Sequence, residues 1–280
     1  MKDLLEIARR GERTLVMGIL NITPESFSDG GRFLAADTAI RHAEQMAEDG
    51  ADIIDLGGES TRPGADPLSI EDELARVLPV VQALTKRISL PLSIDTYKAE
   101  VARRTVDAGA AMINDISALA FDSEMGKTAA ELGVPVCLMH IRGTPRNMQN
   151  NPHYDDVAAE VRRQLADRVD FALAAGISKD NIILDPGFGF AKSANHNLEL
   201  LRRLGELTSL GYPLLSGTSR KSTIGKVLGG LPAEERLEGT AATVAISIAN
   251  GASIVRVHDV KEMKRVAQMT DAIVRGNWIE

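Results

Sequence analysis

Cysteine and positive charge are both scarce in this sequence. Cys137 is the single cysteine among 280 residues, which excludes an intramolecular disulfide and a zinc site built from several cysteines. Acidic residues outnumber basic ones by 39 to 32, and the net charge of −7 argues against a general nucleic-acid-binding protein, which would carry a basic face or arm. The hydrophobic share of 44% is that of an ordinary globular protein and excludes a disordered chain.

Segments that direct a chain to a membrane are also lacking. No apolar run approaches the length needed to span a bilayer. Residues 1–13 carry charge throughout and have no apolar signal core. We therefore expect a cytoplasmic protein that has no membrane partner.

Several motifs of well-known enzyme classes are missing as well. The chain has no G-x-x-x-x-G-K loop, no H-E-x-x-H motif and no serine nucleophile elbow. The five histidines show no zinc spacing, and His42 and His196 are expected on the surface of helices. Residues 185–192, DPGFGFAK, lack the third glycine of a dinucleotide-binding fingerprint, so that signal is weak.

What the sequence does have is a regular alternation of apolar runs and helical segments. We expect strands at eight runs that are apolar almost throughout, as in strands covered on both faces. These runs are 15–20, 52–56, 90–94, 111–114, 134–139, 181–184, 212–215 and 253–257. Between them, apolar residues recur at helical spacing, clearly so in 69–86 and 155–175.

The length of the repeating unit favours one fold. Eight units in 280 residues average 35 residues each, which predicts an α/β fold of the (β/α)8 TIM barrel type rather than an open doubly wound sheet with fewer strands. No linker and no shift in composition divides the chain. We therefore predict a single domain over residues 1–280, in which 1–14 form an N-terminal extension.

Polar residues stand at the end of every expected strand, where a barrel of this type has its active site. They are Asn21, Asp55, Asp95, Asn114, His140, Asp185, Ser216, and Arg256 with His258. Any one of them alone could cap a helix or a turn, but a complete set indicates a functional cleft. Two long loops, 21–31 and 57–67, follow the first two strands and are either functional loops or surface connections.

The segment after the seventh strand has the features of an anion site. Residues 216–222, SGTSRKS, lead into a helix, whose first backbone N–H groups and positive dipole end attract anions. Arg220 and Lys221 add positive charge there. Acids, amides and cations at one barrel mouth indicate a small anionic substrate with a heterocycle edge of donors and acceptors.

Two longer motifs resemble the signatures of a known family. GILNITPESFSDGG (18–31) and GADIIDLGGESTRPGA (50–65) closely resemble the two signatures of dihydropteroate synthase, a family of pterin-binding barrels. The resemblance continues through SIDTYK (93–98), IND (113–115), DPGFGF (185–190), GTSRKS (217–222) and RVHDV (256–260). Glu25 stands where the family usually has Asp, and residues 1–14 carry no family motif.

The resemblance implies an activity. A member of this family joins para-aminobenzoate to 6-hydroxymethyl-7,8-dihydropterin pyrophosphate in folate biosynthesis, giving 7,8-dihydropteroate and pyrophosphate. It implies Mg2+ as cofactor, usually a homodimer, and a target for sulfonamides. Two other functions stay open at this point: a related barrel that passes a methyl group from methyltetrahydrofolate to a corrinoid, and an inactive relative that only binds a pterin or a partner.

The resemblance also assigns roles to individual residues. Asp95, Asn114 and Asp185 would bind the polar edge of the pterin, and Lys221 would bind its carbonyl oxygen. Residues that would complete this part of the site are Met139, Phe190 and Gly217. Asp95 would also stabilise a cation at the pterin methylene.

The remaining roles concern pyrophosphate and para-aminobenzoate. Arg256 and His258 would hold the pyrophosphate together with Mg2+, whose protein ligand would be Asn21. Asn21, Asp95, Lys221 and Arg256 would be the catalytic residues. The residues expected around para-aminobenzoate are Phe27, Thr61, Arg62, Pro63 and, at its carboxylate, Ser219.

Overall fold

The computed structural model describes residues 1–22, 32–276 and 278, with the backbone alone for 32–35. Its strands are β1 (Leu15–Asn21), β2 (Ile53–Gly57), β3 (Leu92–Asp95), β4 (Met112–Asp115), β5 (Val136–Met139), β6 (Ile182–Asp185), β7 (Leu215–Ser216) and β8 (Ile254–Val257). Each of them overlaps one of the expected runs. In this part of the chain they form one eight-stranded sheet in the order β6-β5-β4-β3-β2-β1-β8-β7.

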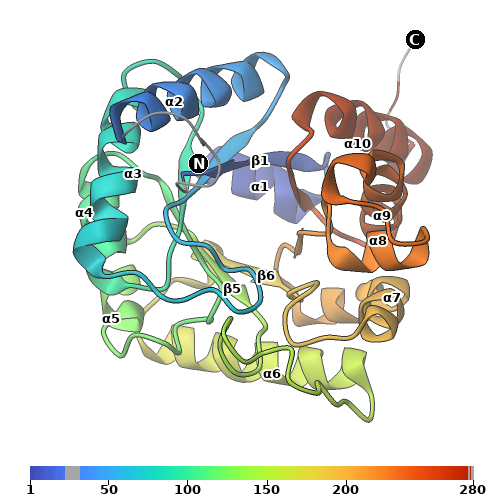
Figure 1. Ribbon diagram of the computed structural model, residues 1–280. Coiled ribbons are helices and arrows are strands. Elements are labelled where there is room, and N and C mark those ends of the chain that lie inside the picture. The colour runs from blue at the N-terminus through green and yellow to red at the C-terminus, as the bar shows by residue number, and fades with distance from the viewer. Residues whose placement is uncertain (23–31, 277, 279–280) are drawn as a thin grey trace.

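The sheet closes on itself, which confirms the predicted barrel. Every paired strand runs parallel to its neighbour. A further parallel bridge between Leu184 and Leu214 joins the two ends of the sheet, β6 and β7. Figure 1 looks onto this barrel and shows the helices arranged around it.

Helices follow the strands in alternation. They are α2 (Arg32–Glu48), α3 (Ile70–Leu84), α4 (Ala99–Asp107), α5 (Met125–Leu132), α6 (Val157–Ala174), α7 (Ala194–Arg202), α8 (Ser222–Val227), α9 (Leu237–Ala249) and α10 (Val260–Arg275). The side chain of Ser69 accepts a hydrogen bond from the backbone N–H of Asp72 and caps α3. The same helix continues through Pro79. None of the helices in the described residues is both long and apolar enough to cross a membrane.

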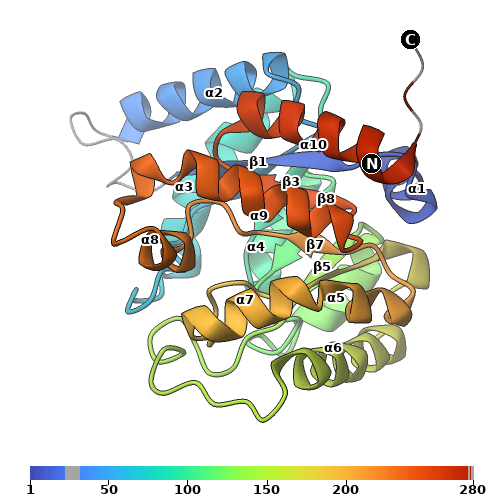
Figure 2. The same ribbon diagram turned by 90° about the vertical axis from the view of Figure 1, so that its right-hand side faces the viewer.

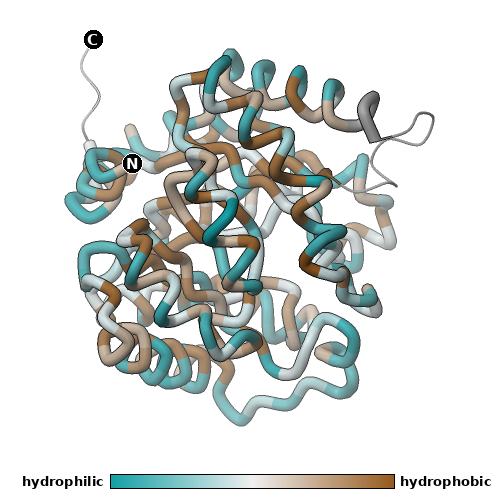
Figure 3. Tube along the Cα trace, turned by 90° about the vertical axis from the view of Figure 1, so that its left-hand side faces the viewer, coloured by the Kyte–Doolittle hydropathy of each residue, from teal (hydrophilic) through white to brown (hydrophobic). Residues whose placement is uncertain are grey.

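Alternation along each strand divides the side chains between two environments. Val16, Leu20 and Ile54 point outward and pack in the large core beneath the helices. Figure 3 shows apolar residues concentrated in the strands and along the inner sides of the helices. Leu15, Met17 and their counterparts point inward and fill the barrel. The inward cluster is Leu15, Met17, Ile53, Met112, Cys137, Ile183, Leu215 and Ile254.

Residues 1–14, for which the sequence predicted no structure, close the N-terminal end of the barrel. They contain helix α1 (Lys2–Arg10), which ends at Gly11 in the left-handed conformation. Leu5 and Ala8 of this helix are buried in the same cluster as the inward-facing strand residues. The N-terminal end of the barrel interior is therefore closed by apolar residues. The polar residues of an active site can gather only at the C-terminal end.

Leu5→Ala should lower the free energy of unfolding by about 2–4 kcal/mol, because it leaves a cavity under the barrel interior. Leu5 is 1% exposed. The measurement is urea unfolding, with Lys2→Ala on the exposed side of the same helix as the control. Activity should be unchanged in both variants, and equal stability in both would mean that α1 does not close the barrel.

Candidate active site at the barrel mouth

Arg256 lies at the centre of the polar end of the barrel. It comes from β8, and its Nε donates to Asp55 Oδ2 on β2 at 2.6 Å. Its Nη2 donates to Asp95 Oδ2 on β3 at 2.8 Å. The amide of Asn114 on β4 donates to the same Asp55 oxygen at 3.0 Å. Four strands thus bring together three residues that the resemblance assigns to the site, and a fourth, Asp55, that it does not.

The sequence indicated no role for Asp55 beyond its place at a strand end. In the structure it accepts hydrogen bonds from two of the expected site residues, Arg256 and Asn114. Its side chain is fully buried, and its Oδ1 has no hydrogen-bond partner among the described residues. The inward position on β2, two residues before Gly57, is the sequence signal that could have identified it. Its carboxylate fixes both the Arg256 guanidinium and the Asn114 amide.

Burial sets the charge of the carboxylates in the mouth. The pKa of Asp95 is raised to about 7, mainly by burial; Arg256 opposes this rise, and the carboxylates of Asp55 and Glu73 add to it. Burial likewise raises the pKa of Asp185 to about 6, against the hydrogen bond from the Gly187 N–H. Arg256 therefore favours the ionised form of Asp95, which burial disfavours.

Lys221 follows β7, the strand that pairs with β8, and lies next to the β6–α7 loop. Its Nζ lies 4.4 Å from the centroid of the Phe190 ring. A Cβ atom on Gly189 would lie 3.0 Å from Lys221 Cδ, and φ of Gly189 is +81°, so this position requires glycine. Burial and, to a smaller extent, Arg256 lower the pKa of Lys221 to about 8. Phe190 packs in one small cluster with Met139, which agrees with their expected proximity.

Ser219 and His258 contact each other directly. Ser219 Oγ lies 3.0 Å from His258 Nδ1 and accepts a hydrogen bond from the His258 backbone N–H at 3.2 Å. Burial, then Arg256 and Arg220, lower the pKa of His258 to about 3. This low pKa favours the neutral imidazole of His258, because burial disfavours its charged form.

The neighbouring residues of that segment have different surroundings. Arg220, which the sequence also counted among the cations facing an anion, pairs with Asp259 through its Nε at 3.0 Å and through Nη2. Gly217 follows β7 directly, and a Cβ there would meet no atom within 4 Å. Open space beside Gly217 is consistent with a position that a substrate approaches.

The second long loop crosses the barrel mouth (Figure 1). Arg62 and Pro63 are exposed on it and Thr61 is half-buried. The N–H of Gly64 donates to the carbonyl of Pro145 at 3.1 Å, so the loop reaches the segment that follows β5. In the described part of the chain, no hydrogen bond connects Thr61 or Pro63 with the polar residues of the mouth.

The base of this loop is firmly held, which the sequence did not predict. Glu59 accepts hydrogen bonds from Tyr97 Oη at 2.6 Å and from the Leu68 N–H at 2.9 Å. Lys98 bridges Glu59 and the buried Glu73. These contacts fix both ends of the loop, at Glu59 and Leu68, over the mouth.

Asn21 ends β1 beside the central network. A Cβ built on Gly57 would lie 3.7 Å from both Asn21 Oδ1 and Asp95 Oδ2, so these two oxygens lie close to one point of the mouth. Phe27 falls outside the described residues. Among the residues that the structure describes, no group of three or more His, Cys, Asp or Glu could hold a metal ion.

Two of the expected strand-end residues do not face the mouth interior. Ser216 points outward and its hydroxyl lies 2.8 Å from that of Ser247 on α9. His140 follows β5 and its Nε2 lies 3.0 Å from Gln164 Oε1 on α6. Lys192, which the sequence did not single out, is buried against His140, with its Nζ 2.9 Å from His140 Nδ1.

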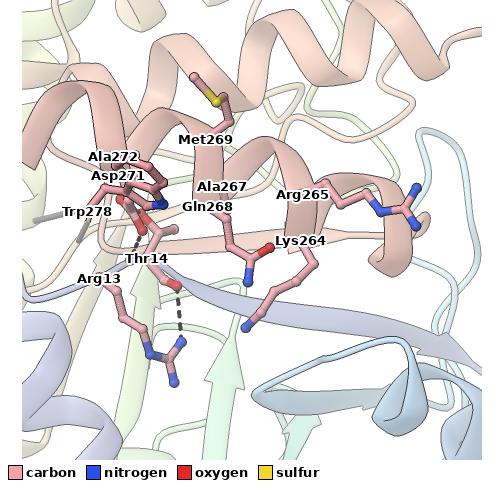
Figure 4. Close-up of a pocket in the computed structure, with 10 residues that line it drawn as sticks. All are labelled: Arg13, Thr14, Lys264, Arg265, Ala267, Gln268, Met269, Asp271, Ala272 and Trp278. Carbon is pink, nitrogen blue, oxygen red and sulfur yellow. Dashed lines mark hydrogen bonds between the residues drawn. The ribbon is translucent and has the colours of Figure 1, made fainter. Parts of the chain in front are cut away.

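A separate pocket of about 700 Å³ lies at the other end of the barrel, between α10 and the residues before β1. Figure 4 shows Arg13, Thr14, Lys264 and Asp271 on its wall. Arg13 and Lys264 are bound to Asp52, and Asp271 accepts a hydrogen bond from the Thr14 N–H. These charged groups are already paired, and the pocket contains none of the expected site residues.

Comparison with known proteins finds relatives that match nearly the whole chain. A sequence model of the family described as pterin binding enzyme matches residues 17–258. The dihydropteroate synthase of Synechocystis sp. is 52% identical over 265 residues, which are 95% of this chain and 92% of that protein. A solved dihydropteroate synthase of Clostridium difficile, in the presence of pteroic acid, superposes with a TM-score of 0.90 at 48% identity, over 95% of this chain and 98% of that one. The Yersinia pestis dihydropteroate synthase, solved as a sulfonamide drug complex, gives 0.89 at 47% identity, over 94% of each chain.

Proposed function

The chain belongs to the dihydropteroate synthase family of pterin-binding enzymes, and from this premise we propose which residues of the barrel mouth perform the reaction. The enzyme is a transferase of folate biosynthesis that condenses 6-hydroxymethyl-7,8-dihydropterin pyrophosphate with para-aminobenzoate. The observation that carries the assignment of roles is that Arg256 binds Asp95 directly and is linked to Asn114 through Asp55, while Lys221 interacts electrostatically with Arg256, Asp185 and Asp95. Relatives near 50% identity favour this activity over corrinoid methyl transfer.

The pterin ring is the substrate part that fits the deepest polar groups. Carboxylates accept hydrogen bonds from the amino group and ring N–H of a pterin, and an ammonium group donates to its carbonyl oxygen. Asp95, Asn114 and Asp185 offer the first kind of contact and Lys221 the second. Met139 and Phe190, which pack together, provide an apolar wall against the ring.

Arg256 and His258 are the proposed hydrogen-bond donors to the departing pyrophosphate. Arg256 already uses Nε and Nη2 for carboxylates, and Nη1 makes no hydrogen bond to the described residues, so it can donate to a phosphate oxygen. Ser219 can donate to His258 Nδ1, which leaves the proton of the neutral imidazole on Nε2 as a second donor. These donors stabilise the leaving group where negative charge develops.

Mg2+ fits the donor set near Asn21. Mg2+ usually keeps several waters and binds through one or two protein oxygens together with substrate phosphates, so the Asn21 amide oxygen beside Asp95 is sufficient. When bound, the ion would neutralise charge on the departing pyrophosphate. No cluster of protein ligands is needed for that role.

The bond changes follow from the substrates. The bond between the pterin methylene carbon and the pyrophosphate oxygen breaks, and its electron pair leaves with pyrophosphate. The cation that remains is stabilised by the electron-rich ring and by the negative charge of Asp95. The para-aminobenzoate nitrogen then attacks the methylene carbon and loses a proton to solvent. No protein nucleophile takes part.

The second loop provides the proposed site for para-aminobenzoate. Thr61, Arg62 and Pro63 lie on the loop that crosses the mouth, and Ser219 stands at the start of the segment leading into α8. Phe27 completes this proposed set. A loop over the mouth would exclude water and so protect the cation from hydrolysis. Sulfonamides, which mimic para-aminobenzoate, should compete at this site, as the complex of the Yersinia pestis relative suggests.

A turnover assay tests the assignment. The protein is supplied with both substrates and Mg2+, and pyrophosphate release is measured together with dihydropteroate formation. Equal amounts of the two products support the proposed reaction. Tight pterin binding without turnover would instead identify an inactive relative that only binds the ligand.

The expected homodimer has a candidate surface on α9 and α10, which lie side by side in Figure 2. Ile246 on α9 and Met269 and Ile273 on α10 are exposed, the last two to 62% and 70%. Met269 and Ile273 are four residues apart and therefore form one apolar stripe. Apolar stripes of this kind are commonly covered by a partner, and a second copy is the partner that the family resemblance suggests.

The double substitution Met269→Glu and Ile273→Glu should convert the dimer into monomers, because it places charge in the proposed apolar contact. The measurement is light scattering after size-exclusion chromatography. Leu173→Glu on α6, which is 39% exposed and lies on another side of the barrel, should stay dimeric. A dimer that survives the double substitution would place the interface elsewhere.

A further inference from the structure

The loop between β6 and α7 forms one wall of the proposed pterin site but has no regular secondary structure. It follows Asp185 and contains Gly189 and Phe190, which contact Lys221. The conformation is unusual: φ of Gly187 is +69°, and a Cβ on that residue would lie 2.0 Å from the carbonyl oxygen of His140. Ala191 also adopts a positive φ of 49°. A loop with such a backbone needs side chains to satisfy its polar groups and to hold its shape.

Gln149, Tyr154 and Asn197 each make one hydrogen bond to the backbone of this loop. Lys192 makes two. Its Nζ lies 3.0 Å from the carbonyl oxygen of Gly187 and 3.1 Å from that of Phe190, to both of which it donates. The third neighbour of the nitrogen is His140 Nδ1, at 2.9 Å. The amine therefore holds the loop at two points and ties it to the segment after β5.

These contacts exclude a direct role for Lys192 in binding substrate. The side chain is 3% exposed and all three hydrogen-bonding positions of its nitrogen are occupied by protein atoms. None of the ion pairs in the described part of the chain includes Lys192, although a buried amine would gain from a carboxylate partner. Burial lowers its pKa to about 7, so burying the charged amine destabilises the folded state. An apolar side chain could fill the same space without this cost.

We propose that Lys192 is a positioning residue that holds the β6–α7 loop in the conformation that receives the pterin ring. By fixing the Phe190 carbonyl, it sets the direction of the Phe190 ring and with it the wall against which Lys221 packs. By fixing the Gly187 carbonyl, it holds the turn whose N–H donates to Asp185 at 2.7 Å. The proposal rests on the assignment of this side of the mouth to the pterin.

The test is Lys192→Met, which keeps most of the apolar stem and removes the amine. The loop contacts the pterin in both the ground state and the transition state, so its loss should raise KM for the pterin substrate while kcat changes little. We expect KM for the pterin pyrophosphate to rise about tenfold or more, since two donors to the loop are lost. KM for para-aminobenzoate should stay the same, because no proposed contact to that substrate lies on this loop.

Asn250→Ala is the matched control. The Asn250 amide donates to the carbonyl of Leu201 at 2.8 Å and so secures the far end of α7, away from the mouth. It should cost stability in thermal unfolding without changing either KM. If Asn250→Ala raises the pterin KM as well, Lys192 has only a general structural role. The same conclusion holds if Lys192→Met raises KM equally for both substrates.

Two further measurements keep the test decisive. If Lys192→Met does not fold, Lys192→Gln, which retains an amide donor, carries the test: a selective rise in pterin KM supports the proposal and a wild-type KM overturns it. Turnover by the wild-type protein separates the two levels of inference. No turnover in the wild type would contradict the proposed function, whereas turnover in the wild type with an unchanged pterin KM in the variant would contradict the role of Lys192 alone.

Discussion

Arg256→Gln should lower kcat/KM by about 10²–10³-fold, the largest effect that we expect from a single substitution in the mouth. Glutamine cannot replace the charge that meets the departing pyrophosphate. It also removes the cation that opposes the effect of burial on the pKa of Asp95, which is about 7 with Arg256 in place. Asp95 would then be largely protonated at neutral pH and would no longer stabilise a cation at the pterin methylene. One substitution therefore weakens the stabilisation of both charges that form when the bond breaks, the negative charge on pyrophosphate and the positive charge on the pterin methylene.

The measurement is steady-state pyrophosphate release at pH 7.5, with Arg13→Gln as the matched control. Arg13 forms a bidentate pair with Asp52, at 3.0 and 2.8 Å, at the opposite end of the barrel. Removing one partner of either pair destabilises the fold, so comparison of the two variants separates loss of stability from loss of chemistry. A kcat/KM in Arg256→Gln within threefold of the Arg13→Gln value would exclude Arg256 from the reaction.

The fold could be predicted from the sequence because strand burial and helix ends leave local signals. The strands of a parallel barrel are covered on both faces, so their apolar runs were visible without any knowledge of contacts. Gly109 and Gly133 adopt the positive φ values of 111° and 63° at the ends of α4 and α5, as expected of glycines that end helices. Helix α1 was missed because residues 1–14 carry no family motif, although Leu5 and Ala8 have helical spacing.

The site could be predicted only in part, because position at a strand end does not give the face of the sheet. A shift of one residue moves a side chain from the barrel interior to the helix layer. Ser216 is an example: it ends β7 but faces α9 and bonds to Ser247. Asp185 and Arg256 lie on β6 and β8, where the sequence predicted strands, whereas their pKa values depend on burial that the sequence does not show.

Contacts between residues that are distant in the chain could not be predicted from the sequence. Asp55 and Arg256 are 201 residues apart, and nothing local to either residue indicates the pair. Lys192 was missed for a similar reason, since its function depends on the carbonyls of a loop whose conformation only the fold determines. The roles of Thr61, Arg62, Phe27 and Asn21 stay predictions, as does the cytoplasmic location.

Lys221→Met should lower kcat/KM for the pterin substrate about tenfold to a hundredfold at pH 7, because it removes a charged hydrogen bond to the ring. The wild-type activity should also depend on the proton of Lys221. Burial disfavours the ammonium form and lowers its pKa to about 8 in the free enzyme. Below that pH the group is charged and can donate to the pterin carbonyl; above it the charge is lost, so kcat/KM should fall as pH rises through about 8.

A pH profile of kcat/KM between 7 and 9.5 tests this assignment, with Lys221→Arg as the conservative variant. Arginine stays protonated across the whole range, so the variant should have lower activity than the wild type but no decline near pH 8. Lys221→Met should likewise show no decline there, since it has no proton to lose. The acid side is a poorer test because pyrophosphate itself titrates near the pKa of Asp185, which is about 6. If the decline near pH 8 persists in both variants, another group titrates there, and the charge of Lys221 is not what the pterin site requires.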